Sequence, residues 1–208
     1  HHPQHDSSEA ILPDGSETSF MFADVRHKLH ACCHGAHAMI EGLRNLGAAH
    51  DITAQNLAAL SIRVNPRWLK VCDIKAPRTG LEVKFSYVFL AAMVLHHIDT
   101  AAYQSYDDSI CGNAGLIATA SKITVIGDEA ISDGAVNVSA DTQTGVRHTT
   151  DFDLMDPIDL SVLGPRLVAK ASVLIGPARA EKIWESMDDL DSMPDAQMAG
   201  CLQPLLSA

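Results

Sequence analysis

An uninterrupted apolar stretch from Tyr87 to Leu95 constrains the fold more than any other part of this sequence. Around it, apolar side chains recur on one side at helical spacing from Glu82 to His97, which predicts one long helix. The stretch is only about half as long as the roughly 20 residues that cross a bilayer. The sequence therefore predicts a helix within a globular domain, and no membrane span.

The elements predicted around this helix follow an irregular order. Helices are expected at 31–46, where Gly47 is a plausible stop, and at 101–106, 160–174 and 178–189; strands are expected at 57–64, 122–126, 135–140 and 146–152. The last two strands are joined by a hairpin connection at 142–145. Rossmann and TIM-barrel folds alternate strands and helices regularly, and this chain does not. We predict an α+β domain with a small, largely antiparallel sheet packed with helices.

The start of the chain differs from the rest in composition. Residues 1–18 are polar and contain Pro3, Pro13 and Gly15, which predicts a tail or an interdomain connection. Residues 19–208 are expected to form a single domain, and a chain of this length can bury roughly 70% of its unfolded surface. Because the sequence opens with His1 and not with Met, we expect a fragment or a processed chain.

The charge balance limits the partners of this chain. Lys and Arg together number 15 against 26 Asp and Glu, which gives a net charge of −11. Nucleic acids and anionic membrane surfaces are therefore disfavoured, because both bind clustered cations. A small anionic substrate stays possible, since the local field of a pocket can oppose the overall charge.

The cysteines indicate a compartment. There are five, an odd number, with no C-x-x-C pair, whereas a secreted disulfide framework uses an even set. Cys32 and Cys33 are adjacent and cannot bridge each other without strain. Reduced thiols and a cytoplasmic location are expected.

A histidine-rich segment has three interpretations. On a helix, His30, His34, His37 and Glu41 would share one face and could hold zinc, although the zincin spacing is absent. The same histidines could be exposed or capping groups at a helix N-terminus. Alternatively, a helix that starts near His34 would direct its free amide groups toward an anion, together with Lys28 and Cys33. The sequence leaves all three open.

Two further segments carry polar groups. Arg78 and Lys84 flank a helix start at which Thr79 or Gly80 could be the cap, and they could meet a carboxylate or remain solvated. His96 and His97 would end the long helix as capping groups. Nucleotide-binding and nucleophile-elbow motifs are absent, and Gly112–Gly115 is expected to be a loop.

Three segments resemble the MmgE/PrpD family, which includes 2-methylcitrate dehydratase, cis-aconitate decarboxylase and iminodisuccinate epimerase. The family pattern Lys-x-Tyr-Pro-x-Cys-x-x-x-His is matched at Lys28–His37, except that His30 and Ala31 replace Tyr-Pro. Pro-x-Thr-x-x-Glu-Ala-Lys-Phe-Ser is matched at Pro77–Ser86, and the carboxy-terminal pattern at Asp156-Pro157 and 176–183. The resemblance is to the C-terminal half of such proteins.

The resemblance implies a smaller α+β domain that closes, as a lid, over an active site in a mostly helical domain. It also implies a lyase (hydro-lyase or decarboxylase) or an isomerase that acts on small di- or tricarboxylates and needs no cofactor or metal. By position, Lys28 is the catalytic or carboxylate-binding lysine, and Cys33 stands where the dehydratase branch has a catalytic histidine. His34, Arg78 and Lys84 are assigned to substrate binding, and His37 to a supporting role.

No part of the chain resembles the family's helical domain, which carries the remaining acid–base residues. We therefore expect this polypeptide to be inactive, or nearly so, without that domain or a homodimer partner. The alternative is a non-catalytic domain that self-associates through the former interdomain face.

Overall fold

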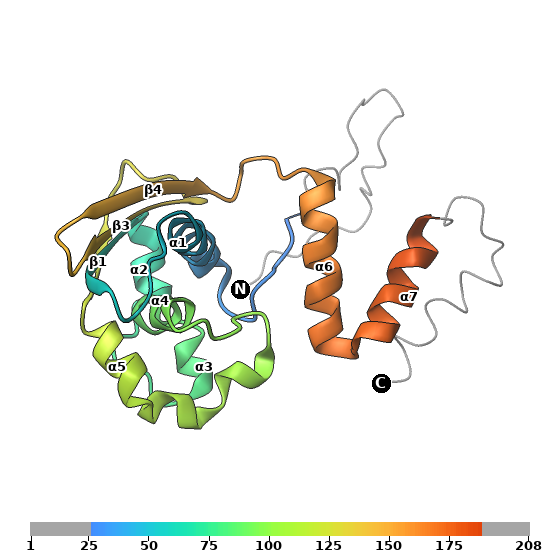
Figure 1. Cartoon of the computed structure of the whole chain (residues 1–208), viewed down its shortest axis with the longest axis horizontal. Helices are drawn as coiled ribbons and strands as arrows, with labels where there is room; N and C mark the ends of the chain where they lie inside the picture. The colour runs from blue at the N-terminus through green and yellow to red at the C-terminus, as the bar shows by residue number, and fades with distance from the viewer. Residues whose placement is uncertain (1–25, 189–208) are drawn as a thin grey trace, which may run out of the picture.

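The computed structural model describes residues 26–188, which form a four-stranded sheet and the helices around it (Figure 1). The sheet has the order β2-β1-β3-β4. Its strands are β1 (Leu57–Val64), β2 (Ile123–Gly127), β3 (Ala135–Thr142) and β4 (Arg147–Asp153). Two of the three strand pairs are antiparallel, and β1 pairs with β2 in parallel. The predicted α+β class is confirmed, with a mixed rather than purely antiparallel sheet.

The helices occur between β1 and β2 and at both ends of the described chain. They are α1 (His37–His50), α2 (Pro66–Cys72), α3 (Gly80–Val83), α4 (Tyr87–Leu95), α5 (Ala114–Ala120), α6 (Leu160–Ile175) and α7 (Pro177–Asp188), with short 3₁₀ helices η1 (His34–Ala36), η2 (Tyr103–Tyr106) and η3 (Asp108–Gly112). The segment between β1 and β2 supplies the long crossover that a parallel pair requires. The expected tail at 1–18 lies outside the described residues.

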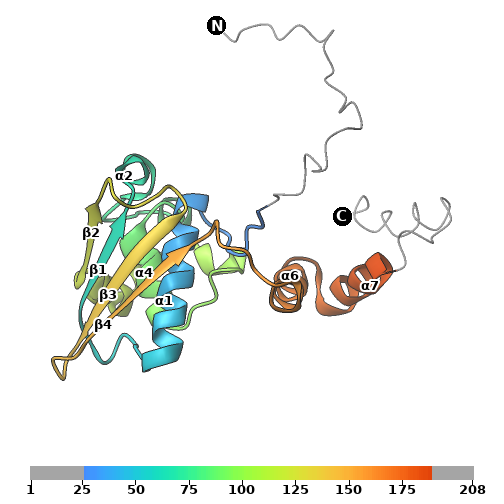
Figure 2. The same cartoon turned by 90° about the horizontal axis from the view of Figure 1, so that it is seen from above.

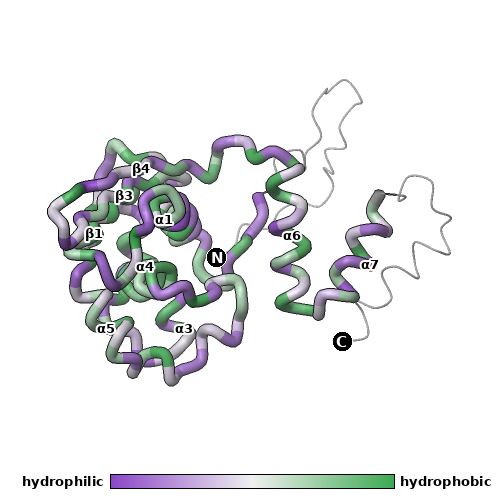
Figure 3. Tube along the Cα trace, viewed as in Figure 1, coloured by the Kyte–Doolittle hydropathy of each residue, from purple (hydrophilic) through white to green (hydrophobic). Residues whose placement is uncertain are grey.

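The core lies between the sheet and two helices, α1 and α4, which cover the same face (Figure 2). Burial alternates along β3, where Val136, Val138 and Ala140 are buried, as expected for a sheet with one covered face. Every residue of α4 except Val94 is buried, and Figure 3 shows this hydrophobic helix inside the body. Among residues 26–188, no helix is long and apolar enough to cross a membrane.

The long helix predicted from Glu82 to His97 is wrong, because the chain forms two helices there. Ser86 separates them: its backbone forms an isolated bridge with Asp73, and its hydroxyl accepts a hydrogen bond from the Phe89 amide at 3.3 Å. Ser86 is therefore the N-cap of α4. Thr79 caps α3 through the Glu82 amide, as one of the two sequence alternatives proposed.

Other differences from prediction also arise at helix ends. Gly47 does not stop α1, which continues to His50 and ends where Asp51 adopts the left-handed conformation at φ 52°. The loop predicted at 112–115 is wrong, because Asn113 caps α5 by accepting a hydrogen bond from Leu116. Sequence analysis missed α2, although Asn65 followed by Pro66 is a typical helix start.

Helices α6 and α7 form a helical hairpin beside the rest of the molecule (Figures 1 and 2). The chain leaves β4 and crosses to α6, which is capped by the carboxylate of Asp159. Their predicted ranges, 160–174 and 178–189, agree with the structure to within a residue over the described part. Polar side chains connect α6 to the rest of the fold and place it at the candidate site.

Candidate functional site

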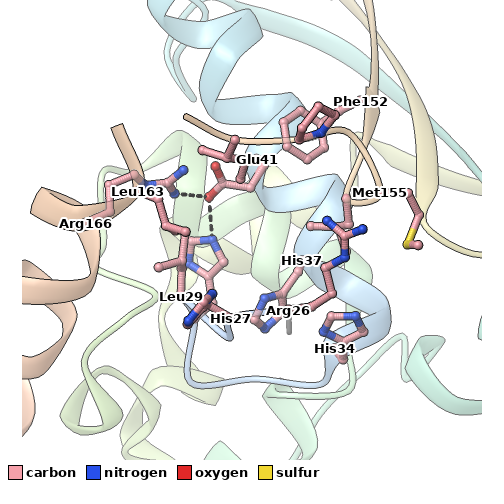
Figure 4. A pocket seen from close by; sticks show the side chains of 14 residues that line it. Arg26, His27, Leu29, His34, His37, Glu41, Phe152, Met155, Leu163 and Arg166 are labelled. Atoms are coloured by element: carbon pink, nitrogen blue, oxygen red, sulfur yellow. Dashed lines mark hydrogen bonds and ion pairs between the residues drawn. The ribbon is translucent and has the colours of Figure 1, made fainter. Parts of the chain in front are cut away.

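A cavity of about 310 Å³ lies where α6 and the end of β4 face the start of α1. Its residues fall into a basic set and an apolar set, with Glu41 as the only carboxylate among them. The lining is Arg26, His27, Leu29, His30, His34, His37, Glu41, Phe152, Leu154, Met155, Pro157, Ile158, Leu163 and Arg166. Arg26, His34 and His37 lie on the side away from Arg166 (Figure 4). In a chain of net charge −11, this is a local concentration of cations and imidazoles.

The buried carboxylate of Glu41 connects α6 to α1. Its Oε1 accepts hydrogen bonds from Arg166 Nη2 at 2.6 Å and from His30 Nε2 at 2.7 Å (Figure 4). Burial alone would raise the pKa of Glu41, but these two bonds and the Arg166 charge outweigh it and lower the pKa to about 2. Glu41 is therefore an anion at neutral pH, and its charge is already balanced by Arg166.

His30 extends this network to the segment after α4. A carboxylate can only accept, so His30 Nε2 carries the proton, and Nδ1 accepts from the Thr100 hydroxyl at 2.8 Å. Burial lowers the pKa of His30, although Glu41 opposes that shift, so the ring is neutral at pH 7. The Thr100 carbonyl in turn accepts from the Ala31 amide and the Tyr106 hydroxyl. This chain of bonds fixes the extended segment that carries Lys28.

At the start of α1, the imidazole ring of His37 lies against two others. The centroid of His37 lies 5.0 Å from that of His30 and 5.3 Å from that of His34. Burial is the largest cause that lowers the pKa of His37, to about 3, and the charges of His30, His34 and Lys28 lower it further. The pKa of His34 is lowered as well, by burial and then by Lys28. Neutral imidazoles can exchange hydrogen bonds or protons with a bound acid.

These shifts predict that acid destabilises the fold well before the carboxylates titrate. An unfolded chain binds a proton at His37 below pH 6.5, whereas the folded ring stays neutral down to about pH 3, so stability is lost as pH falls through this window. The free energy of unfolding should be about 2 kcal/mol lower at pH 5 than at pH 7 from His37 alone. Urea unfolding at both pH values measures it.

The variant His37→Gln should lose less stability between pH 7 and pH 5 than the wild type loses. An equal loss in the two proteins would contradict the assignment of this pH dependence to His37. Below pH 4.5, Glu41 adds a further loss, because its folded pKa of about 2 lies beneath its ordinary value.

A smaller cavity of about 190 Å³ also borders the segment that carries His30. It shares Leu29, His30 and Arg166 with the first cavity and adds the cations Arg44 and Lys170. Lys170 Nζ donates to the Ala101 carbonyl at 2.6 Å, which holds α6 against the loop after α4. The second cavity therefore contains cations as well, together with the carboxylate of Asp99.

Of the sequence-predicted site residues, His34 and His37 line the cavity. Lys28 is exposed on the segment that leads to Cys33, and its charge acts on the rings of His34 and His37, which line the cavity. The half-buried Cys33 donates its amide to the Lys84 carbonyl at 3.0 Å. Lys84 itself lies over the Tyr106 ring, with Nζ 5.0 Å from the centroid.

The contacts of Arg78 lie away from the cavity, whereas Lys28, Cys33 and Lys84, which do not line the cavity either, interact with its neighbouring segments. The Arg78 guanidinium is paired with Glu82 one turn further on, at 3.1 Å, and the Arg78 side chain is 85% exposed. For Arg78, this agrees with the alternative in which the charged side chain at the helix start remains in solvent and does not bind a ligand carboxylate.

The zinc interpretation assumed that His30 lies on the same helix as His34, His37 and Glu41, whereas the free-amide interpretation places the helix start near His34, where η1 does begin. His30 precedes the helix, and only η1, a 3₁₀ turn at His34–Ala36, leads into α1. No group of three His, Cys, Asp or Glu side chains within residues 26–188 could hold a metal ion. The Cys33 amide is already bonded to Lys84, so it does not point free toward an anion.

Three residues of the site were not predicted from the sequence: Arg26, which lines the cavity, Arg166, which binds Glu41, and Thr100, which binds His30. Arg166 lies 125 positions from Glu41, so no local pattern connects them. One signal was available, because Glu41 occupies a position of α1 between buried apolar residues. A buried carboxylate requires a cationic partner.

A family model described as the MmgE/PrpD C-terminal domain matches residues 30–155, more than half of the chain. The chain belongs to the MmgE/PrpD family. The match covers the whole sheet and α1 to α5, whereas α6 and α7 follow it. A search of the curated proteins found no match.

In this MmgE/PrpD domain, the cavity joins matched and unmatched parts of the chain. His30, His37 and Glu41 lie within the matched residues, and Arg166 comes from α6 beyond them. The domain and the helix after it are therefore connected at the cavity itself, through the bond between Arg166 and Glu41.

Proposed function

We propose that this MmgE/PrpD domain is the lid half of a lyase or isomerase that acts on a small di- or tricarboxylate, in the manner of 2-methylcitrate dehydratase. The observation that carries the proposal is the basic cavity at the start of α1, directly after Lys28, in an otherwise acidic protein. The local field of a pocket that contains cations can attract an anionic ligand even on such a protein. The family match supports the reaction class.

In this proposal, the cations bind and the neutral groups move protons. Lys28 and Arg26 neutralise carboxylates, which lowers the barrier to removing water, carbon dioxide or a proton next to a carboxylate. The lowered pKa of His34 keeps its ring neutral at pH 7, so it can accept a proton as a general base. Cys33 is the second catalytic candidate, and Lys84 supports it through the backbone bond to its amide.

The proposed enzyme is completed by a helical domain that supplies the remaining acid–base groups, and it acts in the cytoplasm without a cofactor. By itself the 208-residue chain binds the acid but turns it over slowly or not at all. Efficient turnover of citrate-like acids by this chain alone would contradict that part of the proposal.

The binding step can be tested with tricarballylate, a tricarboxylate that lacks a hydroxyl group. We expect it to bind the full chain in isothermal titration calorimetry, and Lys28→Ala to weaken binding about tenfold through the loss of one ion pair. Lys70→Ala, which removes an exposed lysine from α2, is the matched control and should bind like the wild type. Equal affinities of all three proteins would contradict the role of Lys28.

A second candidate function is a non-catalytic domain that self-associates. It is favoured by exposed apolar side chains on α6, namely Leu160, Val162 and Leu174, with exposed fractions of 68%, 55% and 49%. Exposed apolar surface that gathers in a patch is typical of interaction sites. A dimeric mass in solution, together with no binding of tricarballylate, would favour this candidate over the enzyme.

A further inference from the structure

The second cavity has a lining in which cations outnumber carboxylates. Residues of α1, of α6, of the loop after α4 and of the segment before η1 contribute to it. Its charged side chains are Arg44, Arg166, Lys170 and Asp99. With a volume of about 190 Å³, the cavity is smaller than the roughly 300 to 1,000 Å³ of sites for drug-sized molecules, so its size suits a small ion.

The protein does not neutralise two of these cations. Among residues 26–188, neither Arg44 nor Lys170 forms an ion pair with a carboxylate, and Arg44 forms no hydrogen bond. Lys170 uses one N–H for the Ala101 carbonyl, so two of its three donors remain for a ligand. Arg166, in contrast, is already paired with Glu41.

The positive charges also act on buried groups at the cavity. Burial is the largest cause that lowers the pKa of His30, and the charges of Arg44 and Arg166 lower it further. Burial likewise lowers the pKa of Lys170, although Asp99 opposes this shift. A bound anion would oppose both shifts, because a nearby negative charge favours the protonated form of each group.

The carboxylate of Asp99 selects among small anions. Its Oδ1 accepts a hydrogen bond from the Ala101 amide at 2.8 Å, and a carboxylate in the lining repels any anion that has only acceptor oxygens. Sulfate and the dianion of a phosphate monoester are anions of that kind. Hydrogen phosphate has the same charge but keeps one O–H group, which can donate to the carboxylate. Its other oxygens can accept from guanidinium and ammonium groups, both of which are common phosphate ligands in proteins.

We propose that the second cavity binds inorganic phosphate, with Arg44 and Lys170 as donors to its oxygens and Asp99 as the acceptor of its single proton. The bound ion connects α1, α6 and the loop after α4, and it stabilises the packing of α6 against the rest of the fold. This inference goes beyond the proposed function, because it concerns another cavity and another ligand.

Isothermal titration calorimetry of the full chain at pH 7.5 and low ionic strength tests the binding. Arg44→Gln removes a charge that no other described residue neutralises, and it should weaken phosphate binding about tenfold. Lys70→Gln, which removes an exposed lysine from α2, is the matched control and should bind phosphate like the wild type. Equal affinities of the wild type and Arg44→Gln, or no binding of phosphate at all, would overturn the inference.

A comparison of anions tests the role of Asp99. We expect phosphate to bind about tenfold more tightly than sulfate or methyl phosphate, because only phosphate donates a hydrogen bond to the carboxylate. Asp99→Asn keeps an oxygen for the Ala101 amide but removes the negative charge, so the ratio of phosphate to sulfate affinity should fall to about one. A preference for phosphate that survives in Asp99→Asn overturns the role of Asp99. Methyl phosphate that binds as tightly as phosphate overturns the assignment to the free ion.

Thermal unfolding gives an independent measurement, because a ligand that binds only the folded chain raises the unfolding midpoint. At equal ionic strength, phosphate should raise the midpoint of the wild type more than sulfate does, and this difference should be lost in Arg44→Gln. The same shift in both proteins would overturn the inference.

The outcomes separate this inference from the proposed function, which is tested by tricarballylate and Lys28→Ala. If phosphate binding depends on Arg44 while tricarballylate does not bind, the proposed function fails and the phosphate site stands. If tricarballylate binding depends on Lys28 while phosphate does not bind, the phosphate site fails and the proposed function stands.

Discussion

Glu41→Leu is expected to lower the free energy of unfolding by about 3 kcal/mol, because it leaves the Arg166 guanidinium and the His30 ring without their shared partner. Removing one member of a buried ion pair typically costs 3 to 5 kcal/mol. The lower end applies here, since the Arg166 side chain is 29% exposed and can regain water, whereas Glu41 is 8% exposed. Urea unfolding of the full chain measures the change.

A second substitution tests whether the loss comes from the pair. In Glu41→Leu/Arg166→Met, both charges are replaced by apolar groups of similar size, and such replacements of buried pairs are often neutral. The double variant should therefore be more stable than Glu41→Leu. If the double variant is equally unstable, the loss comes from packing at position 41 and not from the uncompensated guanidinium.

An exposed ion pair on the sheet provides the matched control. Arg147 binds the carboxylate of Asp141 through two nitrogens at 2.7 Å, but its side chain is 68% exposed and that of Asp141 is 33% exposed. Asp141→Ala should change stability far less than Glu41→Leu does, because water replaces an exposed partner readily. The contrast between the two carboxylates isolates the effect of burial.

Gly80→Ala is the second substitution with a large expected effect. A Cβ atom at Gly80 would lie 1.6 Å from the carbonyl oxygen of Tyr106 and 2.5 Å from its carbonyl carbon. Both atoms belong to the backbone, so no side chain can turn away to make room. We expect a loss of about 3 kcal/mol or more, at the upper end of the usual range for overpacked sites. The midpoint of thermal or urea unfolding measures it.

Gly112→Ala is the control for this steric argument. A Cβ atom there has no heavy atom within 4 Å, and Gly112 does not have a positive φ. The substitution should leave stability within about 0.5 kcal/mol of the wild type, the usual range for surface changes. Equal effects of the two substitutions would mean that the contact between Gly80 and Tyr106 is not the cause.

The contact at Gly80 also affects the candidate site, because Tyr106 holds the segment that reaches His30. The Tyr106 hydroxyl donates to the Thr100 carbonyl, and the Thr100 hydroxyl bonds His30. The Gly80 amide donates a hydrogen bond at 2.7 Å to the carboxylate of Asp108, two residues after Tyr106 in the sequence. A displaced Tyr106 would therefore also be expected to disturb the Glu41 network.

Local patterns in the sequence predicted most of the elements correctly. The strand at Leu57–Val64 has the predicted bounds, because alternating burial on a one-sided sheet leaves its own periodicity in the chain. The hairpin at 142–145 was also predicted, and Gly145 there adopts φ 83°, which favours glycine. Helix boundaries were less predictable. Ser86, the N-cap of α4, is extended and forms a backbone bridge with Asp73, which lies outside any local window.

The sequence by itself determined the family, the α+β class and the group of basic residues from Lys28 to His37, because these depend on short motifs and local periodicity. Only the tertiary structure decided which of these residues share a cavity. Arg78 lies outside the cavity, just before α3, and pairs with Glu82 of that helix, whereas Arg166 joins the cavity from 125 positions beyond Glu41. Among residues 26–188, no atom forms a hydrogen bond with the buried Nε2 of His37. The physical reason is that burial and hydrogen-bond partners depend on which distant segments pack together, and no local pattern contains that information.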